Sequence, residues 1–152
     1  MQPRFCYNKR AQETLAAFVN GGRFPHALLL EGPEGSGRRT FAREIAAALF
    51  CRGEHKPCGS CNQCRKVLEQ NHPDVEYYGG DGSRRSFHID TIRQLRQNAW
   101  LLPGEAPCRV CVLCGAENMT DQAQNALLKI LEEPPSHLMF ILATTELHKV
   151  PA

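Results

Sequence analysis

The chain has 152 residues, of which 42% are hydrophobic and 22% are charged, and its formal net charge is +2. This length suits one domain with a full core, since a typical domain holds about 100–150 residues. The near-neutral charge excludes a global electrostatic attraction to nucleic acid, so any such binding must rest on local patches. The chain has no apolar run of the roughly 20 residues that cross a bilayer, and no apolar signal core near its N-terminus. We therefore expect a globular, non-secreted protein of the cytoplasm.

The first part of the chain alternates helical and strand patterns. Residues 9–20 place apolar side chains on one helical face, and two glycines end that segment. The run HALLL at 26–30 is continuously apolar, which is typical of a strand buried on both faces of a parallel sheet. A glycine-rich loop follows, and a helical pattern begins near Arg39. Strand, glycine loop and helix together form the context that a phosphate-binding loop needs.

The stretch 51–72 interrupts this rhythm and predicts a small inserted module. Three further strands are predicted after it: VEYY (75–78), RVCVLC (109–114) and LMFILATT (138–145). One helix is predicted from Ile89 to Ala99, and another follows Thr120, which can cap it, and ends at two prolines. Strands that alternate with helices predict a doubly wound α/β fold with a parallel sheet.

The stretch EGPEGSGRRT resembles a phosphate-binding loop whose working side chains have changed. Gly32, Gly35 and Gly37 stand where such a loop needs glycines. A working loop continues with Lys, which reaches the β- and γ-phosphates, and with Ser or Thr, which binds Mg²⁺. This chain has Arg38 and Arg39 there. A guanidinium is not interchangeable with an ammonium group, and Arg39 removes the Mg²⁺ hydroxyl.

The acidic half of an ATPase site is also missing from the sequence. The strand at 109–114 ends in Cys114, followed by Gly115, where an Asp would hold the metal and a Glu would activate water. Glu117 lies two residues past the Glu position, and we do not assign it that role. The sequence therefore predicts a degenerate site with no catalytic residue and no bound ATP. Weak nucleotide binding is the alternative.

Four of the eight cysteines have the spacing of metal ligands: Cys51, Cys58, Cys61 and Cys64. Four thiolates complete the tetrahedral shell of Zn²⁺ and leave no position for a catalytic water, so we expect a structural zinc site. The alternatives are four reduced thiols or an iron–sulfur cluster, and His55 is a possible substitute ligand.

A second cysteine triplet, Cys108, Cys111 and Cys114, repeats the C-x2-C spacing on a predicted strand. Residues three apart on a strand point to opposite faces, so these thiols are not expected to converge on a metal. Two other features give weaker signals. Arg84 and Arg85 suit a solvated loop better than a phosphate site, and Trp100 suits packing better than ligand stacking.

Together these motifs resemble the clamp-loader branch of the AAA+ proteins. The resemblance rests on HALLLEGPEGSGRRTFAREIAAALFC, the cysteine spacing, NHPDV (71–75), NALLKILEEPP (125–135) and ATT (143–145). It covers nearly the whole chain. It implies an AAA+ domain over 1–152 with a parallel sheet flanked by helices, and a four-cysteine zinc module inserted at 51–72. It also implies that this chain is an N-terminal fragment without the family's lid and collar domains or its arginine finger.

The same resemblance implies a role within the branch. Motor subunits of the gamma/tau type keep Lys-Thr in the loop and Asp-Glu on the strand, whereas delta-prime subunits often lack a working site and act as stators. The changes at Arg38, Arg39, Cys114 and Gly115 are similar to the delta-prime type. The implied function is non-catalytic: the subunit joins gamma/tau and delta subunits and helps load the sliding clamp onto primed DNA during replication.

Two other functions are compatible with the sequence. The first is an ATP-hydrolysing motor subunit of the gamma/tau type that tolerates the substitutions. The second is a zinc-dependent nucleic-acid-binding module, because the cysteine stretch contains several basic residues: Arg52, Lys56, Arg65 and Lys66. ATP hydrolysis by the protein would support the motor subunit. DNA binding that weakens steeply with salt would support the nucleic-acid-binding module.

Overall fold

The computed structural model describes residues 8–79 and 89–146. The elements in chain order are α1 (Lys9–Gly21), β1 (Ala27–Glu31), α2 (Arg38–Phe50), α3 (Asn62–Leu68), β2 (Val75–Gly79), α4 (Ile89–Ala99), β3 (Arg109–Cys114), the short 3-10 helix η1 (Ala116–Asn118), α5 (Asp121–Glu132) and β4 (Leu138–Thr144). The strands pair in the order β1-β4-β3-β2, and every pair is parallel. The predicted α/β fold with a parallel sheet is therefore confirmed.

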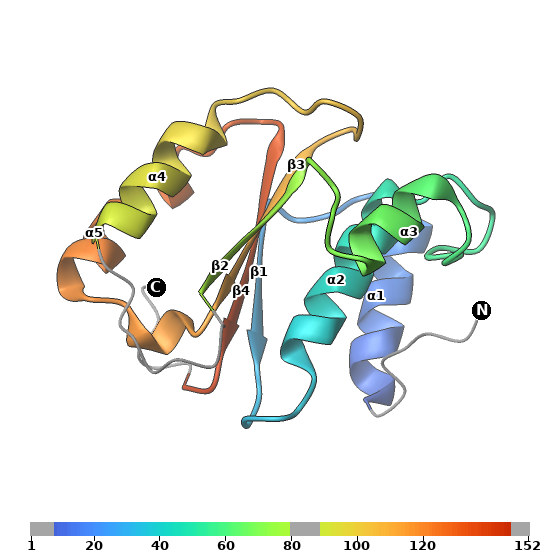
Figure 1. Cartoon of the computed structure of the whole chain (residues 1–152). Coiled ribbons are helices and arrows are strands. Elements are labelled where there is room, and N and C mark those ends of the chain that lie inside the picture. The colour runs from blue at the N-terminus through green and yellow to red at the C-terminus, as the bar shows by residue number, and fades with distance from the viewer. Residues whose placement is uncertain (1–7, 80–88, 147–152) are drawn as a thin grey trace.

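The sheet separates two layers of helices (Figure 1). Helices α1, α2 and α3 cover one face, where Phe41, Ile45 and Val67 pack against alternate strand residues such as Val112 and Ile141. Helices α4 and α5 cover the other face through a second apolar cluster: Ile92, Leu95, Ala99, Ala123, Leu127 and Ile130 on the helices, and Cys111, Leu113, Phe140 and Leu142 on the strands. Because successive strand residues alternate between faces, β3 and β4 contribute to both clusters.

Burial along the strands follows their position in the sheet. Every residue of β3 and β4 is buried, as expected for inner strands of a parallel sheet. The expectation that the run at 26–30 is buried on both faces is wrong. Within the described residues β1 pairs with β4 alone, and Leu29 is 42% exposed. A strand at the edge of a sheet has fewer neighbours to cover it, whatever its hydropathy.

The helix boundaries follow local signals that the sequence contains. Asn8 precedes α1, and its side chain accepts a hydrogen bond from the Ala11 backbone N–H at 3.0 Å. Gly22 ends the same helix in the left-handed conformation with φ of 64°. Helix α2 begins at Arg38, one residue before the predicted start. Thr120 caps α5 as predicted, since its Oγ1 accepts from the Ala123 N–H at 3.2 Å.

Replacing Thr120 by Ala is expected to destabilise the protein by about 1 kcal/mol, because the substitution removes a helix cap. In a chain of this size that lowers the melting temperature by roughly 2–4 °C. Thr14→Ala is the matched control, because Thr14 lies exposed within α1, where its hydroxyl donates to the Arg10 carbonyl. Thermal unfolding by circular dichroism measures both. Equal melting temperatures for the two variants would contradict the capping role.

Two further predictions can be compared with the structure. Trp100 was expected to pack against other residues, but it lies just after α4 and is 65% exposed. Its neighbours Leu101 and Leu102 are also exposed. The loop that contains Arg84 and Arg85 lies outside the described residues. No helix within 8–79 or 89–146 is long and apolar enough to cross a membrane.

Candidate metal centre and degenerate phosphate loop

The glycine loop connects β1 to α2 with the backbone of a phosphate cradle. Gly35 and Gly37 have φ of 79° and 84°, and Gly37 stands at the N-cap of α2. The Gly32 N–H donates to the carbonyl of Thr144 at 3.2 Å, which fastens the start of the loop to the end of β4. The strand, loop and helix that the sequence predicted are therefore present. Their backbone aims the N-terminus of α2 at the carboxyl edge of the sheet.

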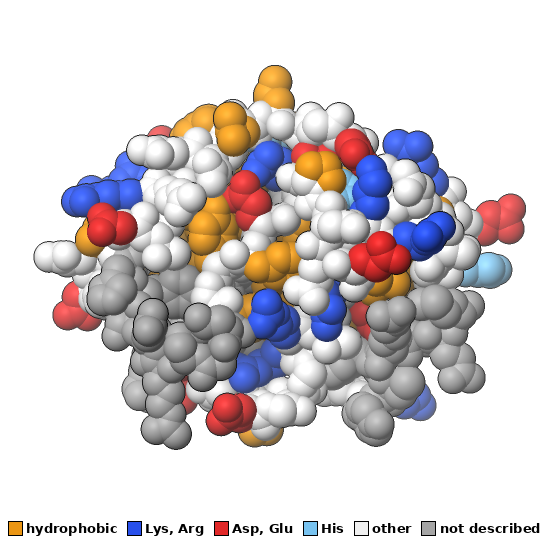
Figure 2. Space-filling model, viewed as in Figure 1, with side chains coloured by type: hydrophobic (Ala, Val, Ile, Leu, Met, Phe, Trp, Pro, Cys, Tyr) orange, Lys and Arg blue, Asp and Glu red, His pale blue; other side chains and the backbone are white. Residues whose placement is uncertain are grey.

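The two arginines that replace Lys-Thr have different surroundings. The Arg39 guanidinium lies over the ring of Tyr77 on β2, 5.9 Å from the ring centroid. A cation in that position interacts with the aromatic face. Arg38 lies on the other flank of the loop and lines a cavity of about 290 Å³ beside α1 and β1. On the face of the molecule shown in Figure 2, Lys and Arg side chains gather beside the start of α2.

The end of β3 holds Cys114 and Gly115, where an ATPase would have Asp and Glu. Cys114 is 6% exposed. Burial raises the pKa of its thiol, and the guanidinium groups of Arg39 and Arg38 oppose that shift only in part. The thiol is therefore neutral at neutral pH and does not replace a metal-binding carboxylate.

Gly115 adopts a backbone conformation that disfavours a glutamate. Its φ is 76°, in the left-handed region that side chains with a Cβ rarely adopt. A Cβ added there would also lie 3.2 Å from the Asn118 side-chain nitrogen. The backbone at the end of β3 is thus suited to the glycine that the sequence has there.

Glu117, to which the sequence assigned no catalytic role, joins two parts of the carboxyl edge. Its carboxylate accepts hydrogen bonds from the Thr144 hydroxyl at 2.9 Å and from the Thr145 N–H at 3.4 Å. Burial would raise the pKa of Glu117, but hydrogen bonds from its own backbone and from Thr144 lower it overall. The ionised side chain therefore ties η1 to the end of β4.

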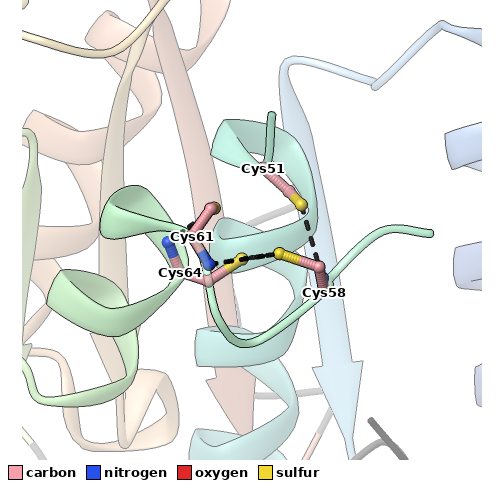
Figure 3. A group of neighbouring side chains, drawn as sticks. All are labelled: Cys51, Cys58, Cys61 and Cys64. Atoms are coloured by element: carbon pink, nitrogen blue, oxygen red, sulfur yellow. Dashed lines mark hydrogen bonds between the residues drawn. The ribbon is translucent and has the colours of Figure 1, made fainter. Parts of the chain in front are cut away.

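The four cysteines with ligand spacing lie together where α2 ends and α3 begins (Figure 3). Cys51 follows the last residue of α2, Cys61 caps α3, and Cys64 lies in the first turn of α3. The four Sγ atoms all lie within 4.8 Å of one another. The Sγ atoms of Cys58 and Cys64 are 4.0 Å apart. The structure therefore brings together the complete predicted ligand set.

This arrangement fits a tetrahedral zinc ion. A Zn–S distance of about 2.3 Å places tetrahedral sulfurs about 3.8 Å apart, which a small contraction of the cluster achieves. Backbone N–H groups already face the sulfurs: those of Gly53 and Cys58 donate to Cys51 at 3.3 Å, and that of Cys61 donates to Cys58 at 3.3 Å. Such donors stabilise thiolates, which are the form that binds metal.

The thiol pKa values reflect the same donors. The backbone N–H of Cys61 contributes most to lowering the pKa of Cys58, to about 5. Burial opposes ionisation of Cys61, but N–H donors of Arg52 and Cys64 lower its pKa overall. Burial raises the pKa of Cys64, which is fully buried, so a bound cation is needed to make it a thiolate at neutral pH.

The second cysteine triplet does not form a metal site. Cys108 and Cys114 pack on the face covered by α2, whereas Cys111 packs against α4 and α5 on the opposite face. The period of the strand separates them, as the sequence predicted. Among the described residues, the four-cysteine cluster is the group of potential ligands that converges.

A buried polar network next to the metal centre was not predicted. His72 Nδ1 accepts a hydrogen bond from the Asp74 N–H at 3.0 Å, so the ring proton lies on Nε2, which is 2.5 Å from the side-chain oxygen of Gln63 on α3. The Asp74 carboxylate is buried and accepts three backbone N–H bonds, from Gly104, Glu105 and Ala106, at 2.7–2.8 Å. The sequence signal for this network is the motif NHPDV, which contains both His72 and Asp74.

His72 is expected to make the folded state less stable in mild acid. Burial lowers its pKa below the ordinary value of 6.5, and the nearby Asp74 offsets this only partly. The neutral ring therefore stabilises the fold fully above about pH 6.5, and this contribution is lost as pH falls through that value toward the folded pKa. The slope approaches about 1.4 kcal/mol per pH unit. Urea unfolding at several pH values from 5.5 to 7.5 gives the free energy of unfolding as a function of pH. This free energy should change less with pH in His72→Gln than in the wild-type protein, and equal pH dependence would contradict the role of His72.

Comparison with known proteins identifies the family. A family model described as "DNA polymerase III, delta subunit" matches residues 7–152. The chain belongs to this family. DNA polymerase III subunit gamma/tau of Mycobacterium tuberculosis is 37% identical over 138 residues, which cover 90% of this chain and 24% of that protein. Subunit delta' of Yersinia pestis is 37% identical over 123 residues, which cover 80% of this chain and 36% of that protein.

A solved structure supports the same assignment. The crystal structure of a DNA polymerase III gamma subunit-related protein from Thermotoga maritima superposes with a TM-score of 0.63 and 25% identity, and the match covers 91% of this chain and 40% of that chain. The predicted clamp-loader family is thus confirmed, and both gamma/tau and delta' subunits are relatives. The chain spans less than half the length of the relatives named here.

Proposed function

We propose that this chain is the AAA+ domain of a non-catalytic, delta-prime-type subunit of a DNA polymerase III clamp loader. In this proposal the domain spans 1–152, contains a zinc module at 51–72, and belongs to a longer protein with lid and collar domains. It acts in the cytoplasm beside gamma/tau and delta subunits, in an assembly that places a sliding clamp on primed DNA. Its contribution is positional, because it holds neighbouring subunits in place.

The observation that carries the proposal is the coordinated loss of both halves of the ATPase site. Arg39 replaces the Mg²⁺ hydroxyl and lies over Tyr77. At the facing strand end, Cys114 is a buried neutral thiol and Gly115 has a backbone that disfavours glutamate. The change in the loop removes the hydroxyl that binds Mg²⁺. The changes at the strand end remove the carboxylate that holds the metal and the base that activates water, so neither half of an ATPase site is complete.

Hydrogen bonds of the chain itself connect neighbouring strand ends at the carboxyl edge of the sheet. The loop joins β4 through Gly32 and Thr144, and the Gly115 N–H donates to the Ala143 carbonyl at 3.0 Å. Glu117 joins η1 to Thr144. These contacts support a rigid edge that does not depend on a nucleotide, which suits a stator.

Calorimetric titration of Mg²⁺-ATP into the full-length protein tests this function. We expect no heat of binding at millimolar nucleotide, whereas a gamma/tau subunit titrated in the same way should bind. Micromolar binding that disappears in Arg38→Ala would overturn the proposal, because Arg38 would then have taken over the task of the lysine. A clamp loader reconstituted without this subunit that keeps its full loading rate would also contradict it.

The ATP-hydrolysing motor remains the second candidate, because gamma/tau relatives are as similar to this chain as the delta' relative. A nucleic-acid-binding module has less support from the structure. Lys66, one of the four basic residues in its argument, pairs with both carboxylate oxygens of Glu105 at 2.7 Å. DNA binding by the full-length protein with a steep salt dependence, lost in Cys61→Ser, would favour that module.

We also propose that the four-cysteine cluster holds a structural zinc ion through Cys51, Cys58, Cys61 and Cys64. The convergence of the sulfurs and the N–H donors that face them support this ligand set. When bound, zinc would close the shell with four thiolates and leave no open position for chemistry. Its task would be to hold α3 against the end of α2.

A further inference from the structure

Helix α3 connects the metal centre to a distant part of the chain. Cys61 caps this helix and Cys64 lies in its first turn, so two of the four ligands determine where α3 sits. From the same helix, Lys66 reaches Glu105 in the segment 100–108, which joins α4 to β3, and Gln63 contacts His72. In Figure 1 this segment runs from α4 over the end of the sheet toward the side of α3 before it enters β3.

The first connection is direct. The Lys66 ammonium lies 2.7 Å from both carboxylate oxygens of Glu105, and about one third of each side chain is exposed. The Lys66 hydrogen bond is also the largest cause of the lowered pKa of Glu105. This pair spans 39 residues of sequence, so it ties the segment to α3 and not to its own neighbours.

The second connection passes through buried groups. Gln63 contacts His72, His72 accepts from the Asp74 N–H, and Asp74 accepts three N–H bonds from Gly104 to Ala106. His72 and Asp74 are 4% and 1% exposed, so solvent does not compete with these bonds. The segment also packs against the apolar cluster that contains Cys51 and Cys64 through Ala106 and Cys108.

We propose that metal binding at the four cysteines and the conformation of the segment 100–108 are coupled through α3. Without the metal, α3 loses the restraint at Cys61 and Cys64, and Gln63 and Lys66 no longer hold the segment. The inference rests on the zinc site proposed above. It assigns the module a task beyond its own folding: it positions the segment that begins with the exposed Trp100, Leu101 and Leu102.

Linkage provides a test that does not depend on clamp loading. If zinc orders the segment, contacts of the segment must raise zinc affinity by the same factor. Zinc affinity of the full-length protein can be measured by competition with a chromophoric chelator. Glu105→Gln is expected to weaken zinc binding about fivefold or more, the low end for coupled sites. Glu69→Gln is the matched control, because Glu69 is an exposed carboxylate at the end of α3.

The sign of the effect separates coupling from simple electrostatics. Four thiolates around Zn²⁺ carry a net negative charge, so removing a nearby carboxylate by itself would leave zinc affinity unchanged or increase it. Coupling predicts weaker zinc binding for Glu105→Gln and no weakening for Glu69→Gln. Lys66→Gln cuts the same contact from the helix side and should match it, whereas Arg65→Gln, at an exposed neighbour, should not.

Trp100 provides a second readout: it is the single tryptophan of this chain, and Trp100→Phe in the full-length protein defines its share of the emission. Removing zinc should change its emission and its quenching by acrylamide, and Glu105→Gln with zinc bound should shift both toward the metal-free values. Unchanged zinc affinity in Glu105→Gln and Lys66→Gln, with zinc bound to both, would overturn the coupling and leave the metal site standing. Failure of the wild-type protein to bind zinc would overturn both.

Discussion

Full-length protein purified with zinc is expected to contain one ion per chain and to lose about 4 kcal/mol of stability when zinc is removed. That figure corresponds to free zinc about a thousandfold above its dissociation constant. Cys64→Ser should lack zinc and melt like the metal-free protein, because Cys64 is a fully buried ligand on α3.

Cys111→Ala is the matched control for the zinc experiment. Cys111 belongs to the second cysteine triplet and is buried on β3, but it packs on the opposite face of the sheet from the four converging sulfurs. It should keep a full complement of zinc, measured by atomic emission. Full zinc content in Cys64→Ser would contradict the ligand set. Visible absorption of an iron–sulfur cluster in anaerobically purified protein would replace zinc by that cofactor.

Asp74→Asn is expected to have the second large effect, lowering the free energy of unfolding by about 2–4 kcal/mol. The buried carboxylate accepts from Gly104, Glu105 and Ala106, and an amide offers one acceptor oxygen and two donors that face the same N–H groups. Denaturant unfolding measures the loss. Hydrogen exchange should accelerate at those three N–H groups more than in the centre of β3.

The pH dependence of the Asp74 contribution follows from its pKa. Burial would raise that pKa, but the N–H donors of Gly104 and Ala106 lower it overall. The contribution is therefore complete above about pH 4, the unfolded value, and is lost as pH falls toward the lower folded pKa. Asp121→Asn, at the exposed first turn of α5, is the control and should cost only a few tenths of a kcal/mol. Equal losses in the two variants would show that the Asp74 network does not stabilise the fold.

Much of the fold could be predicted because its signals are local. The apolar runs of β3 and β4, the cap at Thr120 and the glycines of the loop each act within a few residues, through backbone geometry and alternation of faces. The convergence of the four cysteines belongs partly to the same class, since C-x2-C turns place Cys58, Cys61 and Cys64 together, whereas Cys51 joins them across six intervening residues. The prediction of a degenerate phosphate loop is of the same local kind, because such a loop requires particular side chains at particular positions.

Other features depended on which segments meet in space. The run at 26–30 has the hydropathy of an inner strand, yet within the described residues β1 is paired on one side, so Leu29 is half exposed. Trp100 is apolar but follows the last residue of α4, where nothing in its own sequence neighbourhood covers it. Burial is a property of the neighbours, and the neighbours come from elsewhere in the chain.

The polar network shows the same division most clearly. By itself the sequence determined the parallel α/β fold, the spacing of the four cysteines and the replacement of the side chains that an ATPase uses, all of which follow from residue type and short spacing. The tertiary structure alone decided that Asp74 accepts hydrogen bonds from residues 30–32 positions away and that Lys66 reaches Glu105. Short spacing does not encode such contacts, because they exist only after the sheet has brought β2, α3 and the segment 100–108 together.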